Sequence, residues 1–114
     1  MKRAISMVVL GFFLSGIVYA AEPTAPEDVL RDARGGDAEA QVEMGILYEY
    51  GFRMKGNRVV ALAWYYLAAD QGNTRAAKYR DRLQSKLGAS QVKMARKQSQ
   101  ALIVRQVDSG RLGP

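Results

Sequence analysis

The sequence repeats itself at a fixed spacing of 36 residues. The segment Gly36-Asp37-Ala38-Glu39-Ala40-Gln41 returns as Gly72-Asn73-Thr74-Arg75-Ala76-Ala77, and the stretches that precede the two copies also correspond. A constant period of roughly 20–50 residues is typical of a solenoid, in which one pair of helices stacks on the next. We therefore predict an all-α fold, a short α-solenoid of antiparallel helix pairs.

The capping residues and the spacing of apolar residues predict five helices. Asp37, Asn57 and Ser90 are expected N-caps, because their short side chains can accept a hydrogen bond from a first-turn N–H group. Gly51 is expected to end a helix in the left-handed conformation. The expected ranges are 24–34, which opens on a Thr-x-x-Glu capping box, 38–50, 58–71, 74–87 and 91 to about 107.

The helix expected at 38–50 has apolar residues on two nearly opposite sides. A helix of this kind packs against neighbours on both sides, as an interior helix of a solenoid does. Between its two apolar stripes lie Glu39, Glu43 and Tyr50, which no neighbour is expected to cover. The first stripe consists of Ala40, Met44, Leu47 and Tyr48, and the second consists of Val42 and Ile46.

The helix expected at 58–71 is apolar on all sides, because the eleven residues 59–69 carry no charge. Such a helix must be buried on all sides, and its repeat neighbours cover only part of it. The helix at 74–87 keeps one apolar face only, which suits the end of a stack. We expect a C-terminal closing helix, within residues 88–114, to fold back over the outer side of helix 58–71. A homodimer contact is the alternative cover.

Residues 1–20 have the features of an export signal peptide. Lys2 and Arg3 precede an apolar run, and the small residues Val18 and Ala20 predict cleavage after Ala20. The alternative is an uncleaved membrane anchor, although the run is short against the ~20 residues that span a bilayer. Either way we expect a periplasmic or secreted bacterial protein, whose mature chain starts with residues 21–27.

The composition argues against catalysis. The chain contains no cysteine and no histidine, which excludes a thiol nucleophile and removes the commonest metal ligand and proton shuttle. The carboxylate pair Glu39 and Glu43 is expected on an exposed helix face, without the cavity that an acid–base site needs. We therefore expect no enzyme activity, no cofactor and no metal site.

Small and aromatic residues recur in a specific order along the helices at 38–50 and 58–71. Ala40, Met44, Gly45, Tyr48 and Gly51 are followed by Ala61, Trp64, Tyr65, Ala68, Ala69, Gly72 and Ala76. Over about residues 28–83 this pattern resembles the Sel-one-like repeat, a relative of the tetratricopeptide repeat, and we assign residues 28–87 to the repeat region. Only one full repeat is present, flanked by partial ones. The small residues let helices cross closely, and the aromatic side chains fill the space between them.

The resemblance implies a non-catalytic protein–protein interaction or scaffold module with a short binding groove. Its partner is an unidentified protein. Glu39, Glu43 and Tyr50 are the candidate groove residues, because helical spacing places them on one face. Arg53 stands where the family usually has a second glycine in the inter-helix loop, so Arg53 and Lys55 are expected to project. The aromatic residues at 64–66 are expected to be core rather than a ligand site.

Charge is distributed unevenly along the chain. Residues 21–51 carry eight acids and two bases, whereas residues 52–114 carry thirteen bases and three acids. The alternative function is therefore electrostatic binding to an anionic envelope surface, either lipid headgroups or a polysaccharide. Nucleic acid is disfavoured by the export signal and by the lack of aromatic residues among the bases. The basic residues considered are Arg75, Lys78, Arg80, Arg82, Lys86, Lys93, Arg96 and Lys97.

Overall fold

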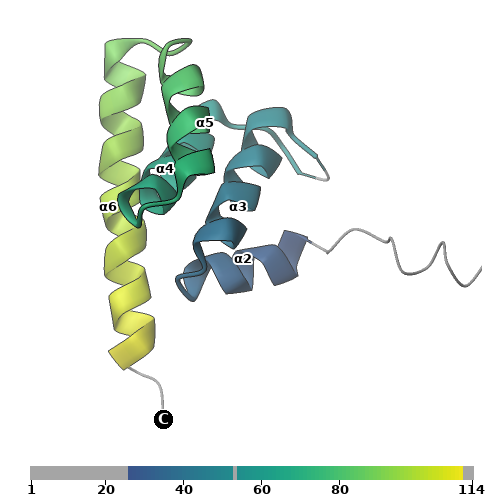
Figure 1. Ribbon diagram of the computed structural model, residues 1–114, viewed down its shortest axis with the longest axis vertical. Helices are drawn as coiled ribbons and strands as arrows, with labels where there is room; N and C mark the ends of the chain where they lie inside the picture. The colour runs from purple at the N-terminus through teal and green to yellow at the C-terminus, as the bar shows by residue number, and fades with distance from the viewer. Residues whose placement is uncertain (1–25, 53, 112–114) are drawn as a thin grey trace, which may run out of the picture.

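The structure is a computed structural model that describes residues 26–52 and 54–111. These residues form helices and no strand (Figure 1). The predicted export signal, its cleavage site and Arg53 lie outside the described residues. The all-α solenoid predicted from the sequence is confirmed. The helices are α2 (Pro26–Arg34), α3 (Ala38–Tyr50), α4 (Arg58–Asp70), α5 (Thr74–Gln84) and α6 (Ala89–Arg111).

The central helices begin where their caps predict. Asp37 accepts a hydrogen bond from the Ala40 N–H at 2.9 Å, and Asn57 accepts one from the Val60 N–H at 3.1 Å. Gly51 ends α3 with φ 73°, and its N–H donates to the Leu47 carbonyl. Each helix therefore satisfies part of its unpaired terminal backbone through its own neighbouring residues.

The predicted ends around the α5–α6 turn were wrong. Helix α5 ends at Gln84 instead of residue 87, because the chain tightens there into a turn in which the Lys86 N–H donates to the Leu83 carbonyl at 2.9 Å. Helix α6 begins at Ala89, so Ser90 is not its cap. Gly88 takes that position, and its N–H donates to the Gln91 side chain at 3.1 Å, as in half of a capping box. At the other end α6 continues to residue 111, beyond the predicted 107.

Helix α4 forms the centre of the molecule, and every residue from Ala61 to Ala68 is buried. Helices α2 and α3 pack against it through Trp64, and α5 packs against it through Tyr65 and Ala68. On α3, Ala40 and Met44 join the cluster around Trp64, while Val42 on the opposite stripe joins Ala68. The two-sided packing of α3 is thus confirmed.

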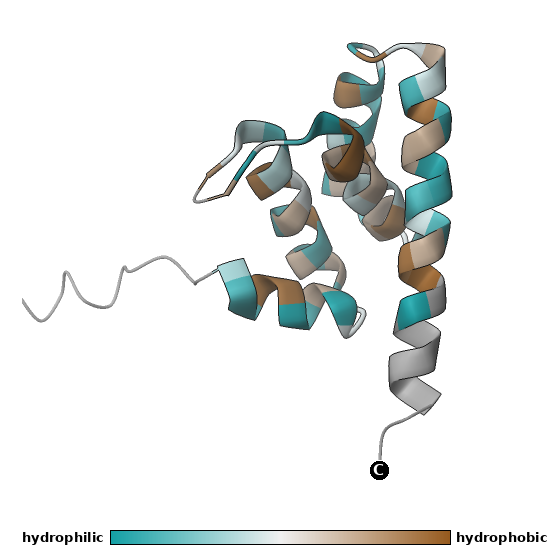
Figure 2. Cartoon of the chain, turned by 180° about the vertical axis from the view of Figure 1, so that it is seen from behind, coloured by the Kyte–Doolittle hydropathy of each residue, from teal (hydrophilic) through white to brown (hydrophobic). Residues whose placement is uncertain are grey.

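Helix α6 runs along the outer side of α4 (Figures 1 and 2). Ala95 is fully buried in the cluster that contains Leu62 and Tyr65, and Leu102 packs beside Trp64. This confirms the predicted closing helix, so the cover of α4 needs no second copy of the chain. Figure 2 shows hydrophilic and hydrophobic residues mixed along α6, as expected of a helix with one packed face.

The predicted repeat-core residues differ in burial. Gly72 is the exposed one. Its φ of 94° favours glycine, so this residue is needed for the backbone conformation of the turn and not for packing in the core. Gly36, one period earlier, also has a positive φ of 105°. Tyr48, Gly51 and Ala69 are half-buried. The buried ones are Ala40, Met44, Gly45, Ala61, Trp64, Tyr65, Ala68 and Ala76.

Helices α3 and α4 cross where Gly45 faces the ring of Tyr65. A Cβ atom added at Gly45 would lie 2.2 Å from Tyr65 Cε1, far inside van der Waals contact. The ring cannot easily move away, because Tyr65 is fully buried and its hydroxyl donates to Glu49 Oε1 at 2.7 Å. Only glycine therefore permits this approach of the two helices.

The carboxylate of Glu49 joins three helices. Its Oε1 atom accepts hydrogen bonds from Tyr65 of α4 and, at 2.8 Å, from the Arg82 guanidinium of α5. The Glu49 side chain is only 5% exposed, so this charge is compensated by its two partners rather than by water. Burial, and then the hydrogen bond to Glu49, raise the pKa of Tyr65 well above its usual range.

Substitution of Gly45 by alanine should destabilise the fold. The added methyl group would force Tyr65 or the backbone to shift, which costs about 1–3 kcal/mol of unfolding free energy. Chemical denaturation measures this loss. The matched control is Gly35→Ala, whose Cβ would make ordinary contacts of 3.4 and 3.5 Å and which should stay within about 0.5 kcal/mol of the parent. Equal stability of both variants and the parent would contradict the close crossing.

Tyr65→Phe should lower stability and change its pH dependence. The variant loses a hydrogen bond to a charged group, which contributes about 1.5–3 kcal/mol. The raised pKa means that the folded state disfavours ionised Tyr65. The stability that protonated Tyr65 contributes is therefore complete below the unfolded-state pKa of about 10, and it is lost as the pH rises above that value.

Urea unfolding between neutral pH and pH 11 measures both effects. The parent should lose stability above about pH 10, and Tyr65→Phe should lose less of it over the same interval. Tyr50→Phe is the control, because Tyr50 is exposed. If the unfolding free energy falls equally steeply with pH in the parent and in Tyr65→Phe, Tyr65 does not contribute to this loss.

Candidate functional site

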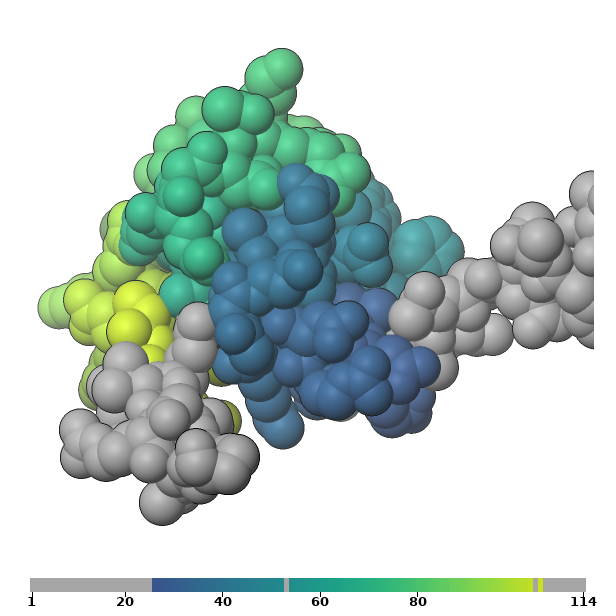
Figure 3. All heavy atoms as spheres, turned by 60° about the horizontal axis from the view of Figure 1, so that its bottom comes forward, coloured from purple at the N-terminus to yellow at the C-terminus, as the bar shows by residue number. Residues whose placement is uncertain are grey.

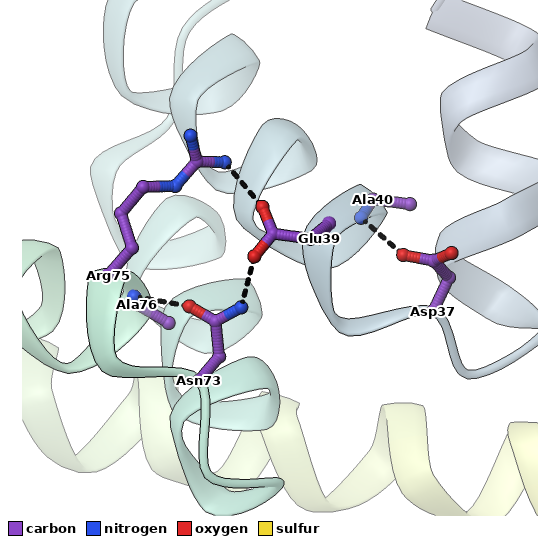
Figure 4. Close-up of polar contacts among 6 residues, drawn as sticks. All are labelled: Asp37, Glu39, Ala40, Asn73, Arg75 and Ala76. Carbon is purple, nitrogen blue, oxygen red and sulfur yellow. Dashed lines mark hydrogen bonds and ion pairs between the residues drawn. The ribbon is translucent and has the colours of Figure 1, made fainter.

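The N-terminal ends of α3 and α5 are joined by side chains that lie one sequence period apart (Figure 4). Glu39 Oε1 accepts a hydrogen bond from the Asn73 amide at 2.6 Å, and its Oε2 accepts one from Arg75 Nη2 at 2.9 Å. Asn73 also caps α5 by accepting from the Ala76 N–H at 2.8 Å. Glu39, proposed from the sequence as a groove residue, is thus engaged within the chain.

Part of the uneven charge distribution is neutralised inside the molecule. Glu39 and Arg75 are separated by the 36-residue period, so the repeat geometry places them at equivalent positions of adjacent units. Glu49 and Arg82 form the second pair between α3 and α5. Each side chain of the Glu39–Arg75 pair is about half exposed, so that bridge contributes only about 0.2–1 kcal/mol. The acids of α3 and the bases of α5 are thereby connected in two places, while α5 packs mainly against α4.

Two large aromatic side chains are exposed at the C-terminal end of α3. Tyr50 is 57% exposed and Phe52 is 58% exposed, and their ring centroids lie 6.1 Å apart. The loop that follows them projects from the body of the molecule (Figures 1 and 2), and Lys55 is exposed on it. Glu43 is exposed on α3 and makes no hydrogen bond or ion pair with another described residue.

Seen from the bottom of Figure 1, α2, α3 and α5 form one continuous surface (Figure 3). Glu39, Glu43 and Tyr50 are all exposed on α3. Glu39 differs from the other two because it is held by α5, which leaves Glu43, Tyr50 and the neighbouring Phe52 as the surface available to a partner. We call these three residues the α3 edge.

The basic residues of α5 and α6 divide by residue type. Every arginine of the predicted set forms an ion pair within the chain, for example Arg96 with Asp70 at 2.8 Å. Arg96 also lies over the ring of Tyr66, with its Cζ atom 3.9 Å from the ring centroid, which adds a cation–π contact. Within the described part of the chain the lysines of the set are exposed and make no such contact. They are Lys78, Lys86, Lys93 and Lys97.

Sequence reasoning overlooked three residues that the structure makes prominent. Glu49 is the buried carboxylate, and Gln41 is a fully buried amide that donates to the Ala33 carbonyl at 3.1 Å and accepts from Gln71 at 2.6 Å. Phe52 completes the exposed aromatic pair. A signal existed for Phe52, since a large apolar residue in a loop is unusual. None existed for Gln41, because its contacts come from residues distant in the sequence.

The described residues contain no group of three or more side chains suited to holding a metal ion. Among the same residues no helix combines the length and the apolar character required to cross a membrane.

Comparison with known proteins finds a solved structure with a similar fold. No protein-family model matches the chain, and no curated protein matches its sequence. The chain is similar to the crystal structure of c5321, a protective antigen present in uropathogenic Escherichia coli strains that displays an SLR fold, the Sel-one-like repeat fold. The TM-score is 0.63 and the identity is 26%, over 75% of this chain and 20% of that one. The chain therefore spans about a fifth of the length of that antigen.

The structural similarity agrees with the residue pattern, since the 36-residue period, the close crossing at Gly45 and the caps at Asp37 and Asn73 all occur in the structure. Folds of this repeat type are protein-interaction modules and are typically not catalytic. The protein has the fold of a short α-solenoid closed by a C-terminal helix, and this fold is similar to the Sel-one-like repeat fold of that antigen.

Proposed function

We propose that this protein is an exported, non-catalytic interaction module of the bacterial envelope that binds a protein partner through the α3 edge. The observation that supports this most directly is the aromatic pair of Tyr50 and Phe52, more than half exposed on a small domain. Tyrosine and other aromatic residues are favoured anchors of protein interfaces, because they bury a large area at low entropic cost.

The surroundings of the aromatic pair favour a protein partner. Glu43 on α3 and Lys55 in the loop offer charges of both signs, as the polar rim of an interface does. The backbone beside the pair is held by α3 and by the Asn57 N–H, which donates to the Tyr48 carbonyl at 2.8 Å. A partner would therefore meet an anchor whose backbone is already ordered, which lowers the entropic cost of binding.

Replacing Tyr50 and Phe52 together by alanine should abolish partner binding without unfolding the chain. Loss of an aromatic anchor costs on the order of 2 kcal/mol or more of binding free energy. Affinity capture from an envelope extract, followed by titration with the captured protein, measures the loss. Met94→Ala is the matched control, because Met94 is 52% exposed on α6, away from this edge. If the double variant retains the partner as tightly as Met94→Ala does, the α3 edge is not the interface.

Export itself rests on residues 1–20, and an N-terminal mass measurement on protein recovered from the envelope tests it. A chain that begins at Ala21 would support the proposal. A chain that stays in the cytoplasm with its first residues intact would contradict it.

A second candidate function is supported by the exposed lysines, which form no ion pair with any residue that the structure describes. Lys93 and Lys97 lie four residues apart on α6 and therefore share a helix face, and Lys78 and Lys86 add two more exposed charges. Such charges can hold an anionic lipid or polysaccharide surface. Unlike the arginines, they can do so without breaking an internal ion pair.

Salt distinguishes the two candidates. Sedimentation with anionic vesicles should decrease sharply above physiological ionic strength, because exposed charges are screened beyond ~8 Å there. Changing the four lysines to glutamine should remove this binding and leave protein capture intact. Vesicle binding that persists at high salt, or in the lysine variant, would contradict the electrostatic function.

A further inference from the structure

We propose that a hollow between α2, α4 and α6 is a second binding site, distinct from the α3 edge, and that it takes an extended protein segment carrying a large apolar side chain next to a carboxylate. Helices α2 and α6 both pack against the central helices but barely touch each other. The space left between them has a volume of about 370 Å³. The inference goes beyond the proposed function, because neither Tyr50 nor Phe52 lines this hollow.

The floor of the hollow is apolar. Trp64 and Ala63 of α4 form its base, Leu30 of α2 forms one wall, and Leu102 of α6 forms the other. Trp64 belongs to the core and is only 3% exposed, so what reaches the hollow is the outer surface of a rigidly held ring. An apolar side chain that enters would bury itself against a preformed surface, which is how most ligand pockets gain affinity.

The charged residues that line the hollow are both arginines. Arg34 comes from the C-terminal end of α2 and Arg105 from α6, and none of the described acidic residues lines the space. Arg34 makes no hydrogen bond or ion pair with another described residue, whereas Arg31, one turn earlier, is paired with Asp28 and Asp32 at 3.4 Å. The guanidinium of Arg34 is therefore available for a carboxylate, the group that its planar donors fit best.

The size of the hollow selects an extended segment over a helix. A helix with its side chains is about 10–12 Å across and needs a long groove. A volume of about 370 Å³ is near the lower end of ligand pockets and suits one or two side chains. Gln98 also lines the hollow, and its amide makes no hydrogen bond with another described residue. It can serve a peptide group of an extended backbone that lies between the two helices.

Trp64 is the only tryptophan of the chain, so its fluorescence reports on the hollow directly. The probes are blocked peptides in which phenylalanine or leucine precedes or follows an aspartate between glycine and serine spacers. The matched probes carry asparagine instead of aspartate. We expect a saturable change in the Trp64 emission with an aspartate peptide, and roughly tenfold weaker binding of its asparagine partner.

Two variants and one control locate the site. Arg34→Gln should weaken the aspartate peptide about tenfold and leave the asparagine peptide unchanged. Ala101→Phe should abolish binding of both, because Ala101 is exposed at the lining of the hollow and a ring there would fill it. Lys93→Gln, on α6 but outside the hollow, should bind as the parent does. All three positions are exposed or lie at the rim, and circular dichroism checks that the variants fold.

The inference is overturned if no peptide gives a saturable change, if aspartate and asparagine peptides bind equally, or if Ala101→Phe binds like the parent. The outcome is independent of the α3 edge. The variant lacking Tyr50 and Phe52 should bind the peptides normally, and Ala101→Phe should still capture a partner that docks on the α3 edge.

Discussion

The rest of the structure depends on the close crossing of α3 and α4, where Gly45 faces the ring of Tyr65. Because no Cβ intervenes, the tyrosine ring can lie against the α3 backbone and extend its hydroxyl to Glu49. Glu49 in turn accepts a hydrogen bond from Arg82, so one contact between two helices also fixes the position of α5. The buried carboxylate is tolerated because both partners compensate its charge, and removal of either would leave it poorly solvated.

The 36-residue period has a direct geometric meaning in this chain. Equivalent positions of adjacent units meet along α3 and α5, which is why Glu39 contacts Arg75 and why Asp37 and Asn73 cap their helices in the same way. Some of the acids in the first half of the chain therefore pair with bases of the second half inside the solenoid, without any partner protein. What remains for recognition is the part of the surface that this packing does not use. It consists of the aromatic pair at the end of α3, the lysines, and the hollow with Arg34, and neither the lysines nor Arg34 form an ion pair with a described residue.

Much of the fold could be predicted, because the signals for it are local. The caps at Asp37 and Asn57 and the glycine at Gly51 placed the ends of α3 and the start of α4 correctly. The uncharged run of α4 showed that a further element had to cover it, and α6 does so. The ends of α5 and α6 could not be placed as well, since the choice between Ser90 and Gly88 as cap depends on how Gln91 folds back. Phe52 was overlooked although a large apolar residue in a predicted loop is unusual, and the structure shows that it is exposed.

The sequence by itself determined the all-α repeat and the burial of the aromatic residues at 64–66, because periodicity and hydrophobicity act over short distances. The close crossing at Gly45 was implied by the family resemblance, and the contact with Tyr65 gives its reason. The sequence could not decide which charges remain free. Glu39 and Glu43 look equivalent in the sequence. Only the position of Arg75 on α5 shows that Glu39 is engaged, whereas Glu43 forms no ion pair with a described residue. The hollow likewise exists only because α2 and α6 pack against the central helices while barely touching each other. Contacts between helices far apart in the chain decide such features, and local sequence carries no record of them.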